Sequence, residues 1–177
     1  KIKKKPKKFG NKLSKKIISN FHFQLTKNQI DIINEINIDL YSQSKMFRLL
    51  QGDVGSGKTI VALIAAANVI ESGYQVAFMA PTEILAEQHY NTIYNILGNA
   101  PKPSVEKNWF SFYLDPISRP LSIGLLVGSQ SKKEKQSIQE LISHNALDIV
   151  IGTHALLQPS VEIPKLSLVI VDEQHRF

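Results

Sequence analysis

Cysteine is absent from the sequence, which excludes disulfide-linked scaffolds and thiolate metal sites and is compatible with a reducing, intracellular location. No apolar run comes near the roughly 18 residues that a membrane-spanning helix needs. The lysine-rich start is not followed by an apolar stretch, so it is not a signal peptide. We therefore expect a cytoplasmic protein without a membrane contact. Its 177 residues, 43% of them hydrophobic, suffice for one domain with a buried core.

Positive charge is concentrated at the start of the chain. Residues 1–20 hold nine lysines and no acidic residue, whereas the remainder has a net charge of −3. Such a block of like charge is typical of a solvated linker, and the alternative is an arm that contacts phosphates. We expect residues 1–20 to be a lysine-rich linker and 21–177 to form the domain. Because the chain begins with lysine, we also expect it to be a piece of a longer protein.

Beyond the linker, apolar residues alternate between helical and strand spacing. Helices are predicted at 26–40, 59–72, 83–97 and 132–144, and strands at 47–51, 75–80, 121–127, 148–152 and 166–171. Strands that alternate with helices are typical of right-handed crossovers and a parallel sheet covered on both faces. The predicted fold class is α/β.

The segment 99–120 interrupts this alternation. It carries four of the eight prolines and the single tryptophan, without a clear period. A loop of this length inside a compact domain is uncommon, so we expect an inserted loop. Its aromatic residues either pack the loop onto the domain or form a platform for stacking bases. On the first interpretation, deleting 99–120 should leave a folded domain.

A phosphate-binding loop is predicted at 52–59, where GDVGSGKT follows a strand and precedes a helix. Glycines allow the backbone to approach the phosphates, and the N–H groups of the loop and the helix start point at phosphate oxygens. Lys58 would neutralise the β- and γ-phosphates, and Thr59 would offer its hydroxyl to Mg²⁺. The predicted nucleotide-binding residues are Gly52, Asp53, Val54, Gly55, Ser56, Gly57, Lys58 and Thr59.

Two adjacent carboxylates, Asp172 and Glu173, follow the last predicted strand. Ligands of a parallel sheet gather at the carboxyl ends of its strands, so this pair is expected beside the phosphate-binding loop. Asp172 would help to hold Mg²⁺, and Glu173 would polarise a water for attack on the γ-phosphate. The expected cofactors are ATP and Mg²⁺, and the expected catalytic residues are Lys58, Asp172 and Glu173.

These motifs together resemble the superfamily 2 DExH helicases. DEQH at 172–175 resembles the DExH box, and FQLTKNQ (23–29), APTEILAEQH (80–89) and IGTHALL (151–157) resemble further helicase motifs in the expected order. Within that superfamily, the residues of QGDVGSGKT, APTEILAEQH, GTHALL and DEQHRF are most similar to those of the RecG family of bacterial DNA helicases. The transcription-repair coupling factors are the nearest alternative, and a non-motor P-loop switch or kinase is a second one.

The resemblance implies roles that the residues alone do not. It assigns Phe23 and Gln29 to the adenine base and His175 to coupling between ATP and DNA. It assigns DNA contacts to Thr82, Glu83, Thr153 and His154, although threonines there are also typical helix caps. Judged from the residues alone, His89 and His154 are expected to be structural or surface residues.

The resemblance also implies a RecA-like domain of an ATP-dependent DNA helicase that remodels branched DNA, such as replication forks and Holliday junctions, in recombination and repair. Its expected partners are DNA and a second RecA-like domain of the same chain. That second domain and a DNA-binding wedge domain are expected to lie outside these 177 residues. Neither Arg48, Arg119 nor Arg176 has the context of an arginine finger, so we expect negligible ATP hydrolysis by this chain alone.

Overall fold

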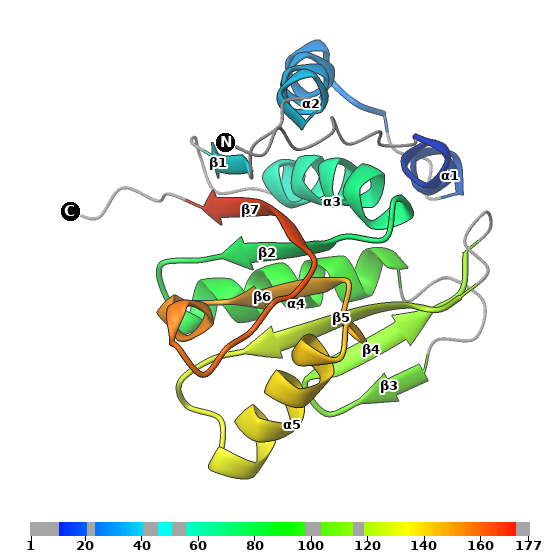
Figure 1. Ribbon diagram of the computed structural model, residues 1–177. Coiled ribbons are helices and arrows are strands. Elements are labelled where there is room, and N and C mark those ends of the chain that lie inside the picture. Colours follow the sequence, from blue (N-terminus) through cyan, green and yellow to red (C-terminus); the bar gives the residue numbers. More distant parts are fainter. Residues whose placement is uncertain are drawn as a thin grey trace, which may run out of the picture.

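The computed structural model describes residues 11–20, 24–40, 46–50, 56–97, 104–114 and 119–172. Seven strands within these residues form one sheet in the order β1-β7-β2-β6-β5-β4-β3 (Figure 1). The first five in this order are parallel, and β4 and β3 are antiparallel additions at one side. The strands are β1 (Met46–Leu50), β2 (Gln75–Met79), β3 (Ser104–Glu106), β4 (Trp109–Phe112), β5 (Leu121–Leu126), β6 (Ile149–Gly152) and β7 (Leu166–Asp172).

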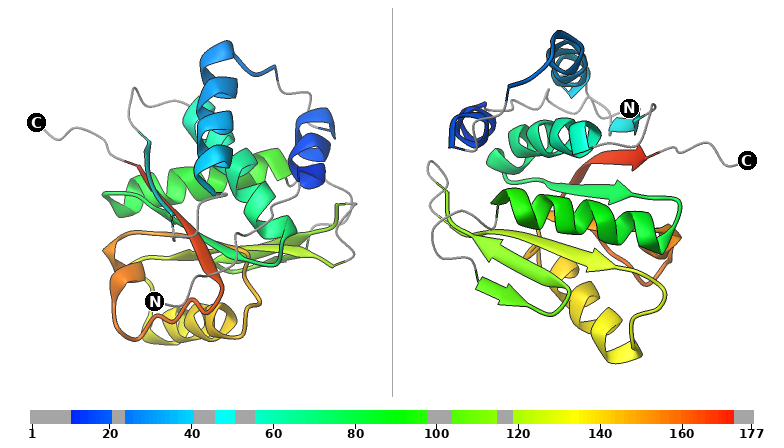
Figure 2. Two further views of the ribbon diagram at one scale, coloured as in Figure 1. Left: turned by 45° about the horizontal axis from the view of Figure 1, so that its top comes forward. Right: turned by 180° about the vertical axis from the view of Figure 1, so that it is seen from behind.

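Helices cover both faces of the sheet. They are α1 (Lys12–Asn20), α2 (Lys27–Leu40), α3 (Ser56–Glu71), α4 (Glu83–Leu97), α5 (Lys132–Ser143) and the short 3₁₀ helix η1 (His154–Leu157). The first four pack in the main hydrophobic cluster, whereas α5 and η1 pack in a second cluster on the other face. Seen from behind, α3 and α4 lie in front of the strands and α5 lies beyond them (Figure 2).

The alternation of side chains along a strand explains the two clusters. In β2, Val76 and Phe78 belong to the main cluster, and Ala77 and Met79 belong to the second. Successive side chains of a strand point to opposite faces, so a strand buried on both sides is apolar throughout. The predicted α/β fold with a mostly parallel sheet is confirmed, as are the predicted helices and strands. No helix in the described ranges is both long and apolar enough to cross a membrane.

The expectation of an irregular loop over 99–120 is wrong for its central part. Residues 104–112 form the hairpin β3-β4, whose turn contains Asn108 at φ 68°. Phe110, Phe112 and Leu114 are at most 5% exposed and belong to the main hydrophobic cluster. The aromatic residues therefore pack the segment into the core, and the expectation that 99–120 can be deleted from a folded domain no longer holds.

The expected boundary at residue 20 is also wrong for the residues that the structure describes. Residues 12–20 form α1, which packs on α3 and places Leu13 and Ile17 in the main cluster with 0% and 1% exposure. The lysines Lys12, Lys15 and Lys16 are solvent-exposed. The lysine-rich block thus contains an amphipathic helix of the domain, because its apolar residues recur at helical spacing beneath the charge.

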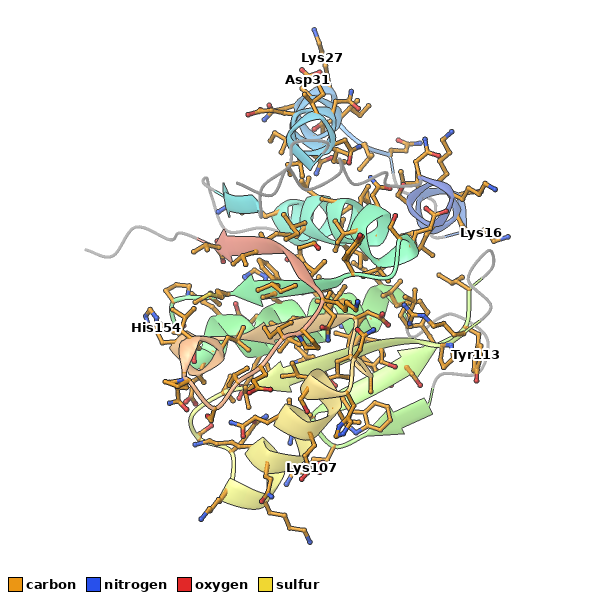
Figure 3. All side chains as sticks on the ribbon, viewed as in Figure 1. Lys16, Lys27, Asp31, Lys107, Tyr113 and His154 are labelled. Carbon is orange, nitrogen blue, oxygen red and sulfur yellow. The ribbon has the colours of Figure 1, made fainter. Side chains whose placement is uncertain are left out.

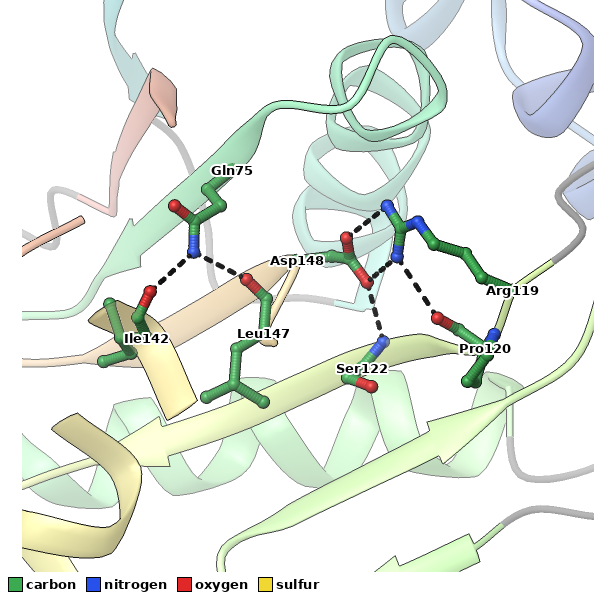
Figure 4. A network of polar contacts seen from close by, with 7 residues as sticks. All are labelled: Gln75, Arg119, Pro120, Ser122, Ile142, Leu147 and Asp148. Atoms are coloured by element: carbon green, nitrogen blue, oxygen red, sulfur yellow. Dashed lines mark hydrogen bonds and ion pairs between the residues drawn. The ribbon is translucent and has the colours of Figure 1, made fainter. Parts of the chain in front are cut away.

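The amino-terminal ends of the central strands are joined by a network of buried polar contacts (Figure 4). The Gln75 amide donates hydrogen bonds to the Ile142 and Leu147 carbonyls. Asp148 receives two hydrogen bonds from Arg119, at 2.7 and 3.0 Å, and one from the Ser122 backbone N–H at 2.9 Å. These contacts satisfy polar groups that would be costly to bury alone.

Candidate functional site at the carboxyl edge of the sheet

The sheet topology brings the start of the helix that carries Lys58 and Thr59 to the end of the strand that carries Asp172. Strand β7 lies between β1 and β2, and its last residue, Asp172, is in register with Leu50 at the end of β1. Helix α3 begins at Ser56, six residues after Leu50, the last residue of β1. The start of α3 and the ends of β1, β7 and β2 consequently share one edge of the sheet (Figure 1). We call it the carboxyl edge.

Lys58 and Asp172 face each other at this edge. The Lys58 Nζ atom lies 3.6 Å from Asp172 Oδ1, which is near enough for charge attraction but long for a hydrogen bond. Both atoms are buried, and neither has a hydrogen-bond partner among the described residues. A buried ammonium and a buried carboxylate oxygen that attract each other but lack hydrogen bonds are costly unless a ligand supplies those bonds. The pair therefore has the chemistry to bind an anion through Lys58 and a cation through Asp172.

His89 of α4 joins the two elements that carry this pair. Its Nε2 lies 2.7 Å from Asp172 Oδ2, and its Nδ1 lies 2.9 Å from the Thr59 hydroxyl. The ring also contacts Phe78 of β2, with centroids 4.6 Å apart and planes tilted by 46°. Thr59 and Asp172 are each 2% exposed and His89 is 7% exposed. His89 was expected to be a structural or surface residue. The structure places it between Thr59 and Asp172, the two predicted Mg²⁺ ligands.

The electrostatics of the cluster favour an ionised Asp172. Burial raises the pKa of the Asp172 carboxyl, but the hydrogen bond that His89 donates and the charge of Lys58 outweigh burial. The net effect holds the pKa below its ordinary value. At neutral pH this carboxylate therefore offers oxygen acceptors, which are the ligands that Mg²⁺ prefers, and Thr59 adds a hydroxyl oxygen nearby.

Gln29, predicted to contact the adenine base, lies beside the first turn of α3. Its Nε2 is 3.4 Å from the Gly57 carbonyl, and a Cβ at Gly57 would come within 2.9 Å of this nitrogen. Its Oε1 accepts a hydrogen bond from the Thr26 N–H, while the Thr26 hydroxyl accepts one from the Gln29 N–H. This reciprocal arrangement is a capping box, which T-x-x-Q at the start of α2 could have predicted.

The predicted DNA-contact residues follow β2 and β6 at the carboxyl edge. Thr82 caps α4 by accepting a hydrogen bond from the Leu85 N–H at 3.3 Å. Thr153 makes no side-chain cap bond to η1, and His154 is exposed at the same edge (Figure 3). The Glu83 carboxylate instead accepts a hydrogen bond from the Ser129 N–H at 2.9 Å, which ties the start of α4 to the loop after β5.

Part of the predicted site falls outside the described residues. This part comprises Phe23, Gly52, Asp53, Val54, Gly55, Glu173 and His175. The described part brings together Lys58, Thr59 and Asp172 and adds His89. A signal for His89 exists in the sequence, because it occupies the stripe of α4 that also buries Ala86, Ile93 and Leu97. A polar residue within an apolar stripe needs a buried partner.

Comparison with known proteins identifies the family. Residues 26–177 match the DEAD/DEAH box helicases. The chain belongs to that family. This confirms the predicted DExH helicase character, and with it the use of ATP that is implied for the family. A non-motor P-loop switch or kinase is accordingly not favoured.

Several relatives are RecG helicases. The ATP-dependent DNA helicase RecG of Borreliella burgdorferi is 45% identical over 165 residues, covering 93% of this chain and 21% of that protein. RecG of Bacillus subtilis is 43% identical over 169 residues, covering 96% of this chain and 22% of that protein. A solved structure of RecG bound to a three-way DNA junction superposes with a TM-score of 0.75 at 40% identity, covering 98% of this chain and 21% of that one. The chain spans about a fifth of the length of these relatives.

Proposed function

We propose that this chain is the nucleotide-binding part of an ATP-dependent DNA helicase that remodels branched DNA in recombination and repair. The observation that supports this most directly is the facing pair of Lys58 Nζ and Asp172 Oδ1, both buried and both without a hydrogen-bond partner in the described ranges. A nucleoside triphosphate with a divalent cation supplies both missing partners at once. The similarity to RecG supports the choice of branched DNA as the substrate.

The residues of the site have distinct proposed roles. Lys58 would neutralise the β- and γ-phosphates, and Thr59 and Asp172 would hold the Mg²⁺ that accompanies them. MgATP, when bound, supplies the phosphoryl group whose transfer to water drives the motor. Glu173 follows Asp172 directly in the sequence, and its proposed role is to orient and deprotonate the attacking water. His175 is proposed to link the nucleotide state to DNA contact.

The DNA is proposed to run along the carboxyl edge. Thr82 and Thr153 follow adjacent strands, since β2 pairs with β6, and their hydroxyl and backbone N–H groups are of the kind that binds phosphates. His154 adds an exposed polar ring there. The Glu83 carboxylate is engaged by the Ser129 N–H, so we now propose it as a brace for this edge in place of a DNA contact.

A second RecA-like domain is the proposed partner in hydrolysis. The side-chain contacts of Arg119 are described by the structure. Arg119 binds Asp148 at the opposite edge of the sheet, so it is not available to a phosphate at the carboxyl edge. An arginine finger contributes roughly 10³–10⁵ in rate, so it has to come from elsewhere. We accordingly propose that these 177 residues alone hydrolyse ATP negligibly.

Lys58→Ala tests the site. In the protein that carries this sequence, the variant should weaken binding of a fluorescent ATP analogue by at least about tenfold, because a charge-assisted contact is worth about 1.5–3 kcal/mol. Lys133→Ala, which removes an exposed lysine from α5 on the other face, is the matched control and should bind like the unmodified protein. Equal affinities of the two variants would refute the site assignment.

DNA stimulation of ATP hydrolysis tests the substrate. The full protein should turn over faster with forked and four-way DNA than with linear duplex of the same length. Equal stimulation by all three would favour the alternative of a transcription-repair coupling factor. No stimulation by any DNA would contradict the proposed motor while leaving the nucleotide site intact.

A further inference from the structure

The Thr59 hydroxyl carries one proton, and because this side chain is buried the proton needs a hydrogen-bond acceptor. A hydroxyl that binds a cation does so through an oxygen lone pair, so its proton has to point to an acceptor elsewhere. The nearest partner that the structure describes for this hydroxyl is His89 Nδ1, at 2.9 Å. Thr59 is 2% exposed, so solvent is a poor substitute for this acceptor.

Asp172 determines which nitrogen of the ring can accept. An ionised carboxylate only accepts hydrogen bonds, so the 2.7 Å contact between Asp172 Oδ2 and His89 Nε2 requires a proton on Nε2. In a neutral ring the other nitrogen, Nδ1, is then bare and accepts the Thr59 proton. One tautomer satisfies both contacts at once, and the contact with Phe78 holds the ring between them.

We propose that His89 is a positioning residue of the metal site, which directs the Thr59 lone pairs toward the divalent cation and holds Asp172 beside it. The proposal rests on the proposed ATP function and adds a residue to it from helix α4, outside the phosphate-binding loop and the DExH box. Partners that orient metal ligands in this way are worth about 10–100-fold in metal affinity. Lys58, the other charged group at this point, faces the second Asp172 oxygen, Oδ1, and does not compete for the ring.

A purely structural role for His89 predicts different behaviour. A ring that only fills space would affect stability and leave the advantage of Mg²⁺ for nucleotide binding unchanged. A ring that orients Thr59 changes that advantage specifically, because phosphate binding through Lys58 does not pass through His89. The ratio of nucleotide affinities with and without Mg²⁺ therefore separates the two roles.

The experiment compares His89→Leu, His89→Gln and Ile93→Ala in the protein that carries this sequence. Leucine removes both ring contacts, whereas glutamine offers a carbonyl acceptor and an N–H donor joined through one carbon, as the two ring nitrogens are. Ile93 is buried one turn further along α4 and is absent from the contacts described for the site, so it controls for loss of packing. Affinity for a fluorescent ATP analogue is measured in saturating Mg²⁺ and in excess chelator.

The expected result is that His89→Leu lowers the Mg²⁺-dependent gain in affinity by about tenfold or more, with the metal-free affinity little changed. His89→Gln should restore part of the gain, and Ile93→Ala should keep all of it. An unchanged gain in His89→Leu, or an equal loss in both conditions, would overturn the proposal. If His89→Leu does not fold, His89→Gln decides alone. A partial loss of the Mg²⁺-dependent gain supports the proposal, and an unchanged gain overturns it.

A second measurement is independent of nucleotide binding. The nitrogen-15 shifts of the His89 ring in the unmodified protein should show a proton on Nε2 and a bare Nδ1 at neutral pH. A proton on Nδ1 would refute the proposed role of the ring. If the unmodified protein binds no nucleotide at all, the proposed function fails, and this spectrum still decides the hydrogen-bond arrangement.

Discussion

Phe110→Ala tests whether the β3-β4 hairpin is part of the core. The Phe110 side chain is 0% exposed and lies edge-on to Tyr90 and Tyr94, with ring centroids 5.6 and 5.1 Å apart, and beside Phe112 at 6.2 Å. Truncating a buried phenylalanine costs about 3–5 kcal/mol through lost transfer energy and the cavity left behind. Since this ring lies in an aromatic cluster on two elements, we expect a loss of about 4 kcal/mol in the free energy of unfolding.

Urea unfolding of the 177-residue chain, followed by circular dichroism, measures this loss. For a chain of this size, 4 kcal/mol corresponds to a fall in Tm of roughly 8–16 °C. The control is Tyr113→Ala in the residues that follow the same hairpin, because Tyr113 is 55% exposed and points away from the body (Figure 3). Its effect should stay within about 0.5 kcal/mol. A loss below about 1 kcal/mol for Phe110→Ala would show that the hairpin is a dispensable insertion after all.

Two further predictions concern polar and titratable groups of the body. Arg119→Leu should lower the free energy of unfolding by about 1–3 kcal/mol, because it leaves the buried Asp148 carboxylate short of partners; Lys107→Ala breaks an exposed ion pair and should cost less than about 1 kcal/mol. Equal urea midpoints for the two variants would contradict this. Burial, with a smaller contribution from Tyr94, raises the pKa of Tyr90 to about 12. Between pH 10 and about 12 the unfolded chain loses this proton while the folded chain keeps it, so stability should fall with rising pH in that window, and less steeply in Tyr90→Phe.

The regular elements could be predicted because periodicity and turn residues agree there. The helix over 59–72 is rich in alanine and is followed by Gly73, which adopts φ 86° as such a stop requires. Strand β7 contains the apolar run LVIV (168–171), as expected of a strand between two parallel neighbours. The phosphate-binding motif adds a fixed spacing to this context, so Lys58 and Thr59 could be placed near Asp172 from sequence alone.

The features that were missed share a physical cause. Strands β3 and β4 are three and four residues long, which is too short for a period to show among the prolines around them. In α1 the lysines mask Leu13 and Ile17, whose spacing of four is a single helical repeat. The contacts of His89 with Thr59 and Asp172 could not be predicted, because the sequence does not show which residues face a helix in the folded domain. In each case local pattern was outweighed by contacts between distant segments.

The contrast between the two edges of the sheet supports the functional interpretation. At the amino-terminal edge, Gln75 and Asp148 are buried and each has its polar atoms engaged by backbone or by Arg119. At the carboxyl edge, Lys58 and Asp172 carry two of the three buried side-chain atoms that lack a hydrogen-bond partner in the described ranges. Leaving such groups unsatisfied costs about 1–3 kcal/mol each, more for charges. Since the buried polar groups of Gln75 and Asp148 at the amino-terminal edge find hydrogen-bond partners, this fold is able to pair such groups. The groups without hydrogen-bond partners at the carboxyl edge are therefore best explained by a ligand whose binding supplies the missing hydrogen bonds.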